Sequence, residues 1–277
     1  MAAAATRLVV AGGSGFLGSR ICQSAVTRGW DVVSLSRHGE PTWDAITSSS
    51  QAPRWAKSVN WAKADMLDPA TYSSHLKNAT AVVYSMGILL EVDYKGILQG
   101  KESVTSGIQK MLCSSSLENG KRNNPPQQSY AVMNRDLAVT LAKHSSEEKV
   151  PTFVYISAES GQPILPSGYI GSKRQAESLI SIDFPETRSI FMRPTFLYDS
   201  SRKLTMPIAL GGIIGSEVNN MLGGRLSFLG PMMAKPLKVG TVGEAVVEAI
   251  SDGVTKGVVS PRKIEDLATK GWRRTML

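Results

Sequence analysis

Tyr169 and Lys173 stand four residues apart, and these residue types at this spacing can carry out acid–base chemistry. Positions i and i+4 share one face of a helix, so we expect the Lys173 ammonium to lie near the Tyr169 phenol. A neighbouring positive charge lowers the pKa of a phenol from its usual ~10. Tyr169 could then act as general acid or base toward a carbonyl or an alcohol. The alternative is a chance occurrence of the two residues at this spacing.

The glycines of residues 12–18 have the spacing of a loop that cradles phosphate groups. They satisfy both Gly-x-Gly-x-x-Gly and Gly-x-x-Gly-x-x-Gly, directly after an apolar run that predicts a strand. One glycine permits the tight turn, another lets the backbone approach a pyrophosphate, and the last lets the following helix pack closely. The N-terminus of that helix offers N–H groups and a positive dipole end to the phosphates. The expected dinucleotide contacts here are Gly12, Gly13, Gly15, Phe16, Leu17 and Gly18.

The residues that end the second predicted strand favour NADP(H) over NAD(H). NAD-specific sites place an acidic residue about 20 positions after the glycine loop, where it binds the ribose 2′-hydroxyl. Here that place reads Ser36-Arg37 and offers no carboxylate. A hydroxyl beside a guanidinium suits a 2′-phosphate, because arginine holds phosphate through two parallel hydrogen bonds. Arg37 could instead stack on the adenine or face solvent. Lys173 is expected to hydrogen-bond the nicotinamide ribose of the same cofactor.

Six short apolar runs predict the strands that position these residues. Helical patterns lie between most of them, including one at about 15–28 that Gly29 would terminate, and a further helix is expected at 242–252. Alternating strands and helices imply an α/β fold, a Rossmann-type doubly wound parallel sheet covered by helices on both faces. The predicted strands are 7–11, 31–36, 59–64, 81–85, 152–156 and 189–192.

The alternation fades late in the chain, which predicts an NAD(P)-binding Rossmann domain at 1–198 and a small C-terminal lid subdomain at 199–277, interleaved with the first. The first contains a long polar loop at 91–128, and loops of that length are usually functional or disordered. The second contains a stretch rich in Met and Gly at 204–233, whose flexible apolar surface could hold an apolar ligand. Ordinary packing on the Rossmann core is the alternative for that stretch.

The composition of the 277-residue chain argues against several other classes. A formal net charge of +8 attracts anions, yet no recognition helix, zinc-finger spacing or aromatic–basic RNA motif supports binding of nucleic acid. Two distant cysteines, Cys22 and Cys113, and three scattered histidines form no metal-ligand cluster, and the low cysteine content indicates a reducing compartment. The first predicted strand begins at Arg7, which leaves no room for a secretory signal, and we also expect no full cleavable mitochondrial presequence. We expect no membrane helix, because no apolar run reaches the ~18 residues needed.

The Tyr-x-x-x-Lys pair after the fifth predicted strand resembles the short-chain dehydrogenase/reductase family. Similar family marks follow the third, fourth and sixth strands, so the resemblance covers essentially the whole chain. It implies further cofactor contacts at the adenine (Asp65, Met66), along the cofactor (Ser85, Met86, Gly87) and beside the nicotinamide (Pro194, Phe196).

Finer motifs are similar to an atypical branch of this family, found in the fungal mitochondrial complex for coenzyme Q biosynthesis and related to the 39-kDa accessory subunit of respiratory complex I. They lie at residues 33–37, 85–91, 155–158 and, most strongly, 167–177. The resemblance implies a protein attached peripherally to the matrix side of the inner mitochondrial membrane. It implies a part in ubiquinone synthesis or in assembly of the complex, with other coenzyme Q biosynthesis proteins as partners. With this resemblance, the apolar ligand of the stretch at 204–233 could be a polyprenyl quinone intermediate.

One position departs from the catalytic pattern of the family. Active members carry Ser or Thr just after the fifth strand to polarise the substrate oxygen, and that hydroxyl is expected at 158 or 159. This chain has Ala158 and Glu159 there, so Ser157 or Ser160 would have to substitute. Removing one such donor typically lowers the rate ~100- to 1,000-fold.

Two functions therefore remain open. The first is an NADP(H)-binding accessory protein that acts in ubiquinone biosynthesis through partners. The second is an active NADPH-dependent oxidoreductase or epimerase on an apolar carbonyl substrate. A separate feature is the basic tail, which could lie at an anionic inner-membrane interface or could be a solvated, frayed terminus; its residues are Lys270, Trp272, Arg273 and Arg274.

Overall fold

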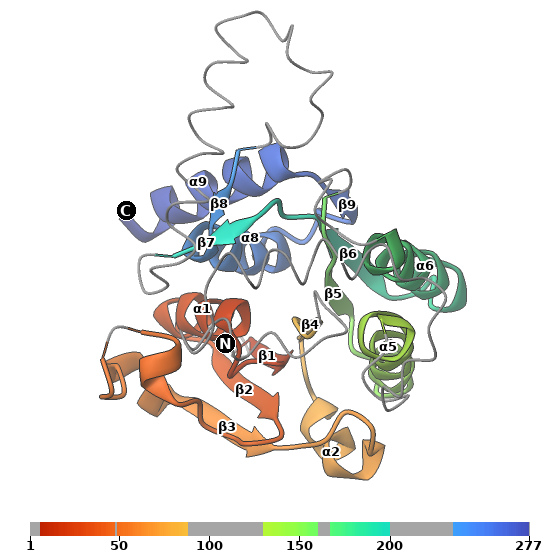
Figure 1. Ribbon diagram of the computed structural model, residues 1–277, viewed down its shortest axis with the longest axis horizontal. Helices are drawn as coiled ribbons and strands as arrows, with labels where there is room; N and C mark the ends of the chain where they lie inside the picture. The colour runs from red at the N-terminus through yellow and green to blue at the C-terminus, as the bar shows by residue number, and fades with distance from the viewer. Residues whose placement is uncertain (1–5, 48, 88–129, 160–166, 200–234, 277) are drawn as a thin grey trace, which may run out of the picture.

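A computed structural model describes residues 6–47, 49–87, 130–159, 167–199 and 235–276. Seven parallel strands form the main sheet, in the order β3-β2-β1-β4-β5-β6-β9 (Figure 1). The order runs outward from β1 in both directions, and this confirms the Rossmann-type doubly wound sheet. The strands are β1 Arg7–Ala11, β2 Asp31–Ser36, β3 Val59–Lys63, β4 Ala81–Tyr84, β5 Thr152–Ile156, β6 Arg188–Met192 and β9 Gly257–Val259.

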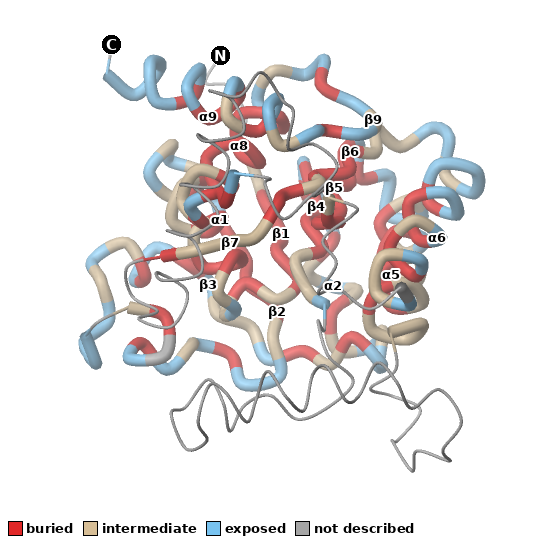
Figure 2. The backbone as a smooth tube through the Cα atoms, turned by 45° about the horizontal axis from the view of Figure 1, so that its top comes forward, coloured by how far each residue is buried: buried red, intermediate tan, exposed pale blue. Residues whose placement is uncertain are grey.

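Helices cover both faces of this sheet because successive side chains of a strand point to opposite sides. In β1, Leu8 and Val10 belong to a buried core shared with α1, α8 and α9, whereas Val9 and Ala11 belong to a second core shared with α2, α5 and α6. Figure 2 shows the central strands buried, with exposed residues on the outer sides of the helices. The helices are α1 Phe16–Thr27, α2 Ser73–Leu76, α5 Leu137–Glu147, α6 Ser167–Asp183, α8 Val239–Ser251 and α9 Pro261–Met276.

The segment between β2 and β3 is ordered around three tryptophans. Trp43 packs edge-on against Trp55 and Trp61, with ring centroids 5.5 and 5.7 Å apart. Edge-to-face aromatic pairs of this kind stabilise a segment beyond the area they bury. A separate two-stranded parallel sheet pairs β7 Leu197–Tyr198 with β8 Leu237–Lys238. These strands come shortly before and after residues 200–234, which the structure does not describe.

The predicted strands are confirmed to within one residue at each end, and Gly29, with φ +73°, follows the end of α1. The sequence analysis missed the short strands β7 and β8 as well as β9 and α9, and the strand–helix alternation continues beyond residue 198. The described part of the predicted lid, 235–276, supplies an edge strand and two covering helices to the Rossmann sheet. The predicted loop at 91–128 and the stretch at 204–233 lie outside the described residues.

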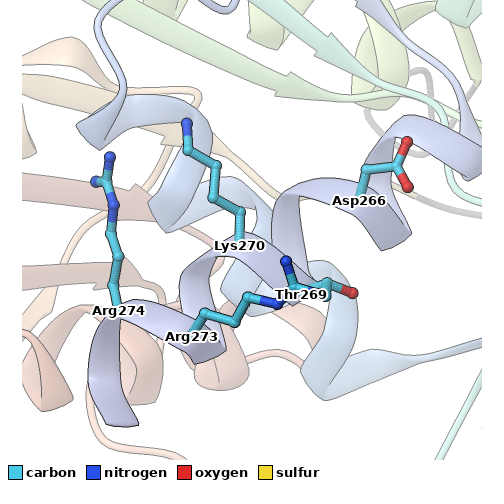
Figure 3. A pocket seen from close by; sticks show the side chains of 5 residues that line it. All are labelled: Asp266, Thr269, Lys270, Arg273 and Arg274. Carbon is cyan, nitrogen blue, oxygen red and sulfur yellow. The ribbon is translucent and has the colours of Figure 1, made fainter. Parts of the chain in front are cut away.

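Helix α9 contains the basic tail: it is helical to Met276, and Trp272, Arg273 and Arg274 are exposed on it. Its apolar stripe buries Ile264, Leu267 and Ala268 at a helical spacing. Beside that stripe, Lys270, Arg273 and Arg274 line a hollow of about 390 Å³, together with Asp266 and Thr269 (Figure 3). Among the helices that the structure describes, none is long and apolar enough to cross a membrane.

Two buried glutamates on α8 tie the C-terminal helices to α1. The side chain of Glu248 is fully buried and lies 2.9 Å from Arg28 Nη1, 3.3 Å from Lys270 Nζ and 3.4 Å from Arg274 Nη1. Glu244 accepts a short hydrogen bond from the same Arg28. Buried carboxylates require such partners, because an unpaired buried charge costs several kcal/mol.

Candidate functional site

The glycine loop joins β1 to α1 and requires glycine at its turn. Gly12 has φ +82°, a conformation that side chains rarely adopt, and a Cβ there would lie 2.7 Å from Met86 Cγ. The turn is closed by the Gly15 N–H, which donates to the Gly12 carbonyl at 2.9 Å. Gly12 is therefore the residue of this loop that permits the tight turn.

Two other glycines let the loop pack against its neighbours. A Cβ on Gly18 would overlap the Gly12 carbonyl oxygen and lie 2.8 Å from Gly13 Cα. A Cβ on Gly13 would overlap the Ser34 hydroxyl of β2. The loop is thus held between β2 and the first turn of α1, with no room for side chains at either position.

The N-terminus of α1 fits a pyrophosphate. Its N-cap residue is Gly15, which has no side chain to occupy the first N–H groups, and the first turn contains no acidic residue. Backbone N–H groups and the positive end of the helix dipole favour an anion at such a terminus. Phe16 and Leu17 form the first turn, with Leu17 buried beneath it.

The end of β2 carries Ser36 and Arg37 at the edge of the sheet where the carboxyl ends of the strands meet. The Ser36 hydroxyl donates to the Gly39 carbonyl at 2.8 Å. The Arg37 side chain is exposed and makes no ion pair within the described residues. At the end of β3, Met66 is buried and the Asp65 carboxylate accepts the Leu67 N–H at 3.0 Å.

The structure brings Tyr169 and Lys173 together on α6. The Lys173 ammonium lies 5.4 Å from the centre of the Tyr169 ring and 5.0 Å from that of Tyr155. It donates to the Ile156 carbonyl at 2.7 Å. Burial lowers the pKa of Lys173 to about 7, with the charge of Glu177 opposing this shift and that of Arg174 adding to it. Lys173 can therefore gain and lose a proton near neutral pH.

Asn134, which the sequence analysis missed, belongs to the same site. It lies in a π-helical turn, Ala131–Asp136, that precedes α5. A Cβ placed on Gly87 would lie 3.1 Å from Asn134 Oδ1 and 3.4 Å from Lys173 Nζ, so these three residues converge. Such π-turns occur frequently at functional sites. The only sequence signal was a polar residue within an amphipathic helix, which is too common to single out.

The carbonyls of this π-helical turn are satisfied by two buried phenols. Tyr84 donates to the Met133 carbonyl at 2.6 Å, and Tyr155 donates to the Asn134 carbonyl at 2.5 Å. Burial raises the pKa of both phenols, so they remain protonated donors at neutral pH. These bonds position Asn134 from the strands β4 and β5.

Ser157, a predicted catalytic residue, is buried and its hydroxyl accepts a hydrogen bond from Arg174 Nη1 at 2.9 Å. Arg174 also donates to the Ala158 carbonyl at 2.7 Å and to Glu177 at 2.7 Å. Glu177 in turn accepts from Arg193, at the end of β6. Arg174 and Glu177 therefore hold the ends of β5 and β6 together; Ser160 lies outside the described residues.

The remaining predicted contacts lie at the same edge. The Ser85 hydroxyl donates to the Ala11 carbonyl at 2.8 Å, which places Met86 against the glycine loop. The Pro194 carbonyl accepts from the Glu159 N–H at 2.9 Å, and the Phe196 carbonyl accepts from the Leu237 N–H at 2.9 Å. Within the described residues, no cluster of His, Cys, Asp and Glu could hold a metal ion.

Comparison with known proteins identifies the family and relatives of this chain. Residues 8–93 match the NAD dependent epimerase/dehydratase family. The chain is 35% identical over 276 residues to MIOREX complex component 2 of Saccharomyces cerevisiae, covering 93% of this chain and 98% of that protein. It is 27% identical over 276 residues to an uncharacterized chloroplastic protein of Arabidopsis thaliana, covering 95% of this chain and 78% of that protein.

Solved structures with the same fold include two that contain NAD. UDP-glucuronic acid 4-epimerase from Bacillus cereus, in complex with NAD, matches with a TM-score of 0.56 at 17% identity, over 92% of this chain and 76% of that chain. The enzyme WbmG of Bordetella bronchiseptica, in complex with NAD, matches with a TM-score of 0.55 at 12% identity, over 97% of this chain and 79% of that chain. At these identities the likeness concerns the fold alone.

Fold and site together define an NAD(P)-binding Rossmann protein. The chain belongs to the short-chain dehydrogenase/reductase family, as an atypical member of the NAD-dependent epimerase/dehydratase type. The yeast MIOREX component is its relative along nearly the whole length of both chains.

Proposed function

We propose that this chain is an NADP(H)-binding accessory member of the mitochondrial complex that synthesises ubiquinone (coenzyme Q). One observation carries the proposal: the glycine loop leads into the N-terminus of α1, whose N-cap has no side chain, whereas Ala158 stands where a catalytic hydroxyl is expected. Such a site would keep the N–H groups that bind a dinucleotide and would lack the hydroxyl that polarises the substrate oxygen during turnover. The bound nucleotide would stabilise the folded chain, and the chain would act through its partners.

Two further observations support a role inside a protein assembly. The yeast relative is named as a component of a complex, and the similarity spans almost its full length. The motifs at 155–158 and 167–177, which resemble the coenzyme Q branch of the family, surround the Tyr169–Lys173 pair. A place on the matrix side of the inner mitochondrial membrane follows from the same resemblance.

A thermal melt with NADPH, NADP⁺, NADH and NAD⁺ tests the cofactor. A ligand that binds only the folded state raises the melting temperature, by roughly 5 °C at a hundredfold excess over Kd for a chain of this size. We expect the NADP pair to give the larger shift and Arg37→Ala to remove the difference between the pairs. Equal shifts of the melting temperature with all four nucleotides would contradict the preference for NADP(H). If no nucleotide shifts the melting temperature, the chain would instead be a scaffold protein that binds no cofactor.

The second candidate function is an active NADPH-dependent oxidoreductase or epimerase on an apolar carbonyl compound. The observation in its favour is the intact pair, with the Lys173 ammonium 5.4 Å from the Tyr169 ring. Tyr169→Phe removes only the phenol oxygen and so separates the two functions.

We expect Tyr169→Phe to restore the ubiquinone content of cells that lack this chain to the wild-type level. An accessory role needs the nucleotide and the surface but no proton transfer from Tyr169. Lys173→Met, which removes the ribose contact instead, serves as the comparison and should restore less. Loss of ubiquinone in the Tyr169→Phe cells, with normal amounts of the variant protein, would instead establish catalysis.

For the membrane contact we propose the outward face of α9. Arg262 and Arg273 are exposed on this helix. Figure 3 shows Arg273. Trp272 is half-exposed and Met276 is exposed, so apolar groups are present on the same helix. Trp and Arg favour the headgroup region of a bilayer, and each cation near an anionic surface contributes about 1 kcal/mol.

Arg273→Glu should weaken binding to vesicles that contain anionic phospholipid about 30-fold, because it changes the local charge by two. Co-sedimentation at low and high salt measures this. Lys77→Glu makes the same charge change at the end of α2, on the far side of the sheet from α9 in Figure 1, and should have little effect. Equal losses in both variants would mean that net charge, rather than α9, attracts the protein to the membrane.

A further inference from the structure

The turn that follows β2 is held in one conformation. The Gly39 N–H donates to the Ser36 carbonyl at 3.3 Å, and the Ser36 hydroxyl donates back to the Gly39 carbonyl at 2.8 Å. Gly39 has φ +73°, which favours glycine. This closed turn presents the exposed side chains of Arg37 and His38 at the carboxyl edge of the sheet.

A lysine from the neighbouring strand reaches the same turn. Lys63 is the last residue of β3 and pairs directly with Ser36 of β2. A Cβ placed on Gly39 would lie 3.2 Å from Lys63 Cγ and 3.7 Å from Lys63 Cε. The aliphatic part of Lys63 therefore runs over Gly39, which is buried although it belongs to a surface turn. The ammonium follows Cε and ends beside the turn that carries Arg37.

This pair of cations has no protein anion to neutralise it. Within the described residues, neither Lys63 nor Arg37 forms an ion pair or a side-chain hydrogen bond. The two acidic residues nearest in sequence are directed elsewhere: Glu40 accepts from the Trp43 indole at 2.9 Å, and Asp65 accepts from the Leu67 N–H. Two unpaired cations at one turn, Arg37 within it and Lys63 over its Gly39, suit an anionic ligand group.

We propose that Lys63 is the second cation of a 2′-phosphate subsite and, together with Arg37, sets the preference for NADP(H) over NAD(H). The proposal rests on the proposed function, because it names the residue that completes the same cofactor site. Arg37 holds the phosphate through its planar fork, and Lys63 adds a point charge from the adjacent strand. The Ser36 hydroxyl, already committed as a donor to Gly39, can still accept.

The test is the ratio of dissociation constants for NADH and NADPH, measured by titration calorimetry at fixed ionic strength. Lys63→Gln should raise the Kd for NADPH about tenfold and leave the Kd for NADH within about twofold, because a charge-assisted contact to the 2′-phosphate is lost. Lys63→Arg should restore most of the preference. Lys57→Gln, which removes an exposed lysine before β3, is the matched control and should change neither constant. The probes 2′,5′-ADP and 5′-AMP repeat the comparison without the nicotinamide half.

Two results would overturn the proposal in distinguishable ways. In the first, wild type prefers NADPH, Arg37→Gln abolishes that preference, and Lys63→Gln retains it. Lys63 then has no part in the subsite, while the proposed NADP(H) cofactor stands. If wild type binds NADH as tightly as NADPH, the proposed cofactor preference fails and the subsite fails with it. An equal loss of affinity for NADH and NADPH in Lys63→Gln, with unchanged thermal stability of the free protein, would also contradict a contact between Lys63 and the 2′-phosphate.

Discussion

Gly18→Ala is expected to lower the affinity for NADPH at least about a hundredfold and to remove the nucleotide-induced rise in melting temperature. The added methyl group overlaps the Gly12 carbonyl oxygen and lies 2.8 Å from Gly13 Cα, and both are backbone atoms. The loop must therefore move away from α1, which displaces the N–H groups that face the pyrophosphate. The same overpacking should cost about 1–3 kcal/mol of stability in the free protein.

Gly240→Ala is the matched control for this variant. Gly240 lies in the first turn of α8, and a Cβ there would meet no atom within 4 Å. Alanine should stabilise the helix by up to about 1 kcal/mol and leave nucleotide binding unchanged. Urea unfolding measures the stability of both variants, and calorimetric titration measures their affinity. Wild-type affinity in a folded Gly18→Ala variant would show that the nucleotide does not bind on this loop.

Glu248→Gln is expected to lower the free energy of unfolding by about 3 kcal/mol, because it removes the charge that balances three cations. Its carboxylate is fully buried and pairs with Arg28, whose side chain is only 11% exposed, and with Lys270 and Arg274. Glutamine keeps the shape of the side chain but leaves Arg28 with only Glu244 as an anionic partner. The helices α8 and α9 should loosen first, because these pairs connect them.

Glu265→Gln tests whether this loss comes from burial. Glu265 lies on α9 and pairs with Lys235 at 2.8 Å, but its side chain is 39% exposed and that of Lys235 is 55% exposed. Exposed pairs contribute about 0–1 kcal/mol, so this variant should be close to wild type. Both variants are compared by urea unfolding at low and high salt. Similar small losses in the two would mean that the buried network contributes nothing beyond a surface pair.

Patterns confined to a few neighbouring residues were sufficient to predict the first six strands, the glycine loop and the Tyr169–Lys173 pair. In β1, a run of apolar residues followed by glycines carries its own signal, because burial on both faces and a turn at Gly12 each require those residue types. The i, i+4 spacing on α6 is likewise a property of the helix alone.

The elements that the sequence analysis missed carry weaker local signals. β9 has three residues and only Val259 is buried, so neither length nor alternation distinguishes it from a loop. α9 has an apolar stripe at helical spacing, Ile264, Leu267 and Ala268, which was obscured by the charged residues around it.

Sequence alone determined that this chain is a dinucleotide-binding Rossmann protein of the short-chain dehydrogenase/reductase type, because the loop, the strands and the helix faces depend on residues close together in the chain. Only the tertiary structure decided which residues complete the site. Asn134 meets Lys173 across two helices, and Lys63 meets the β2 turn through the pairing of β2 with β3. These contacts join residues from separate elements, and no short-range pattern encodes the register and packing that bring them together.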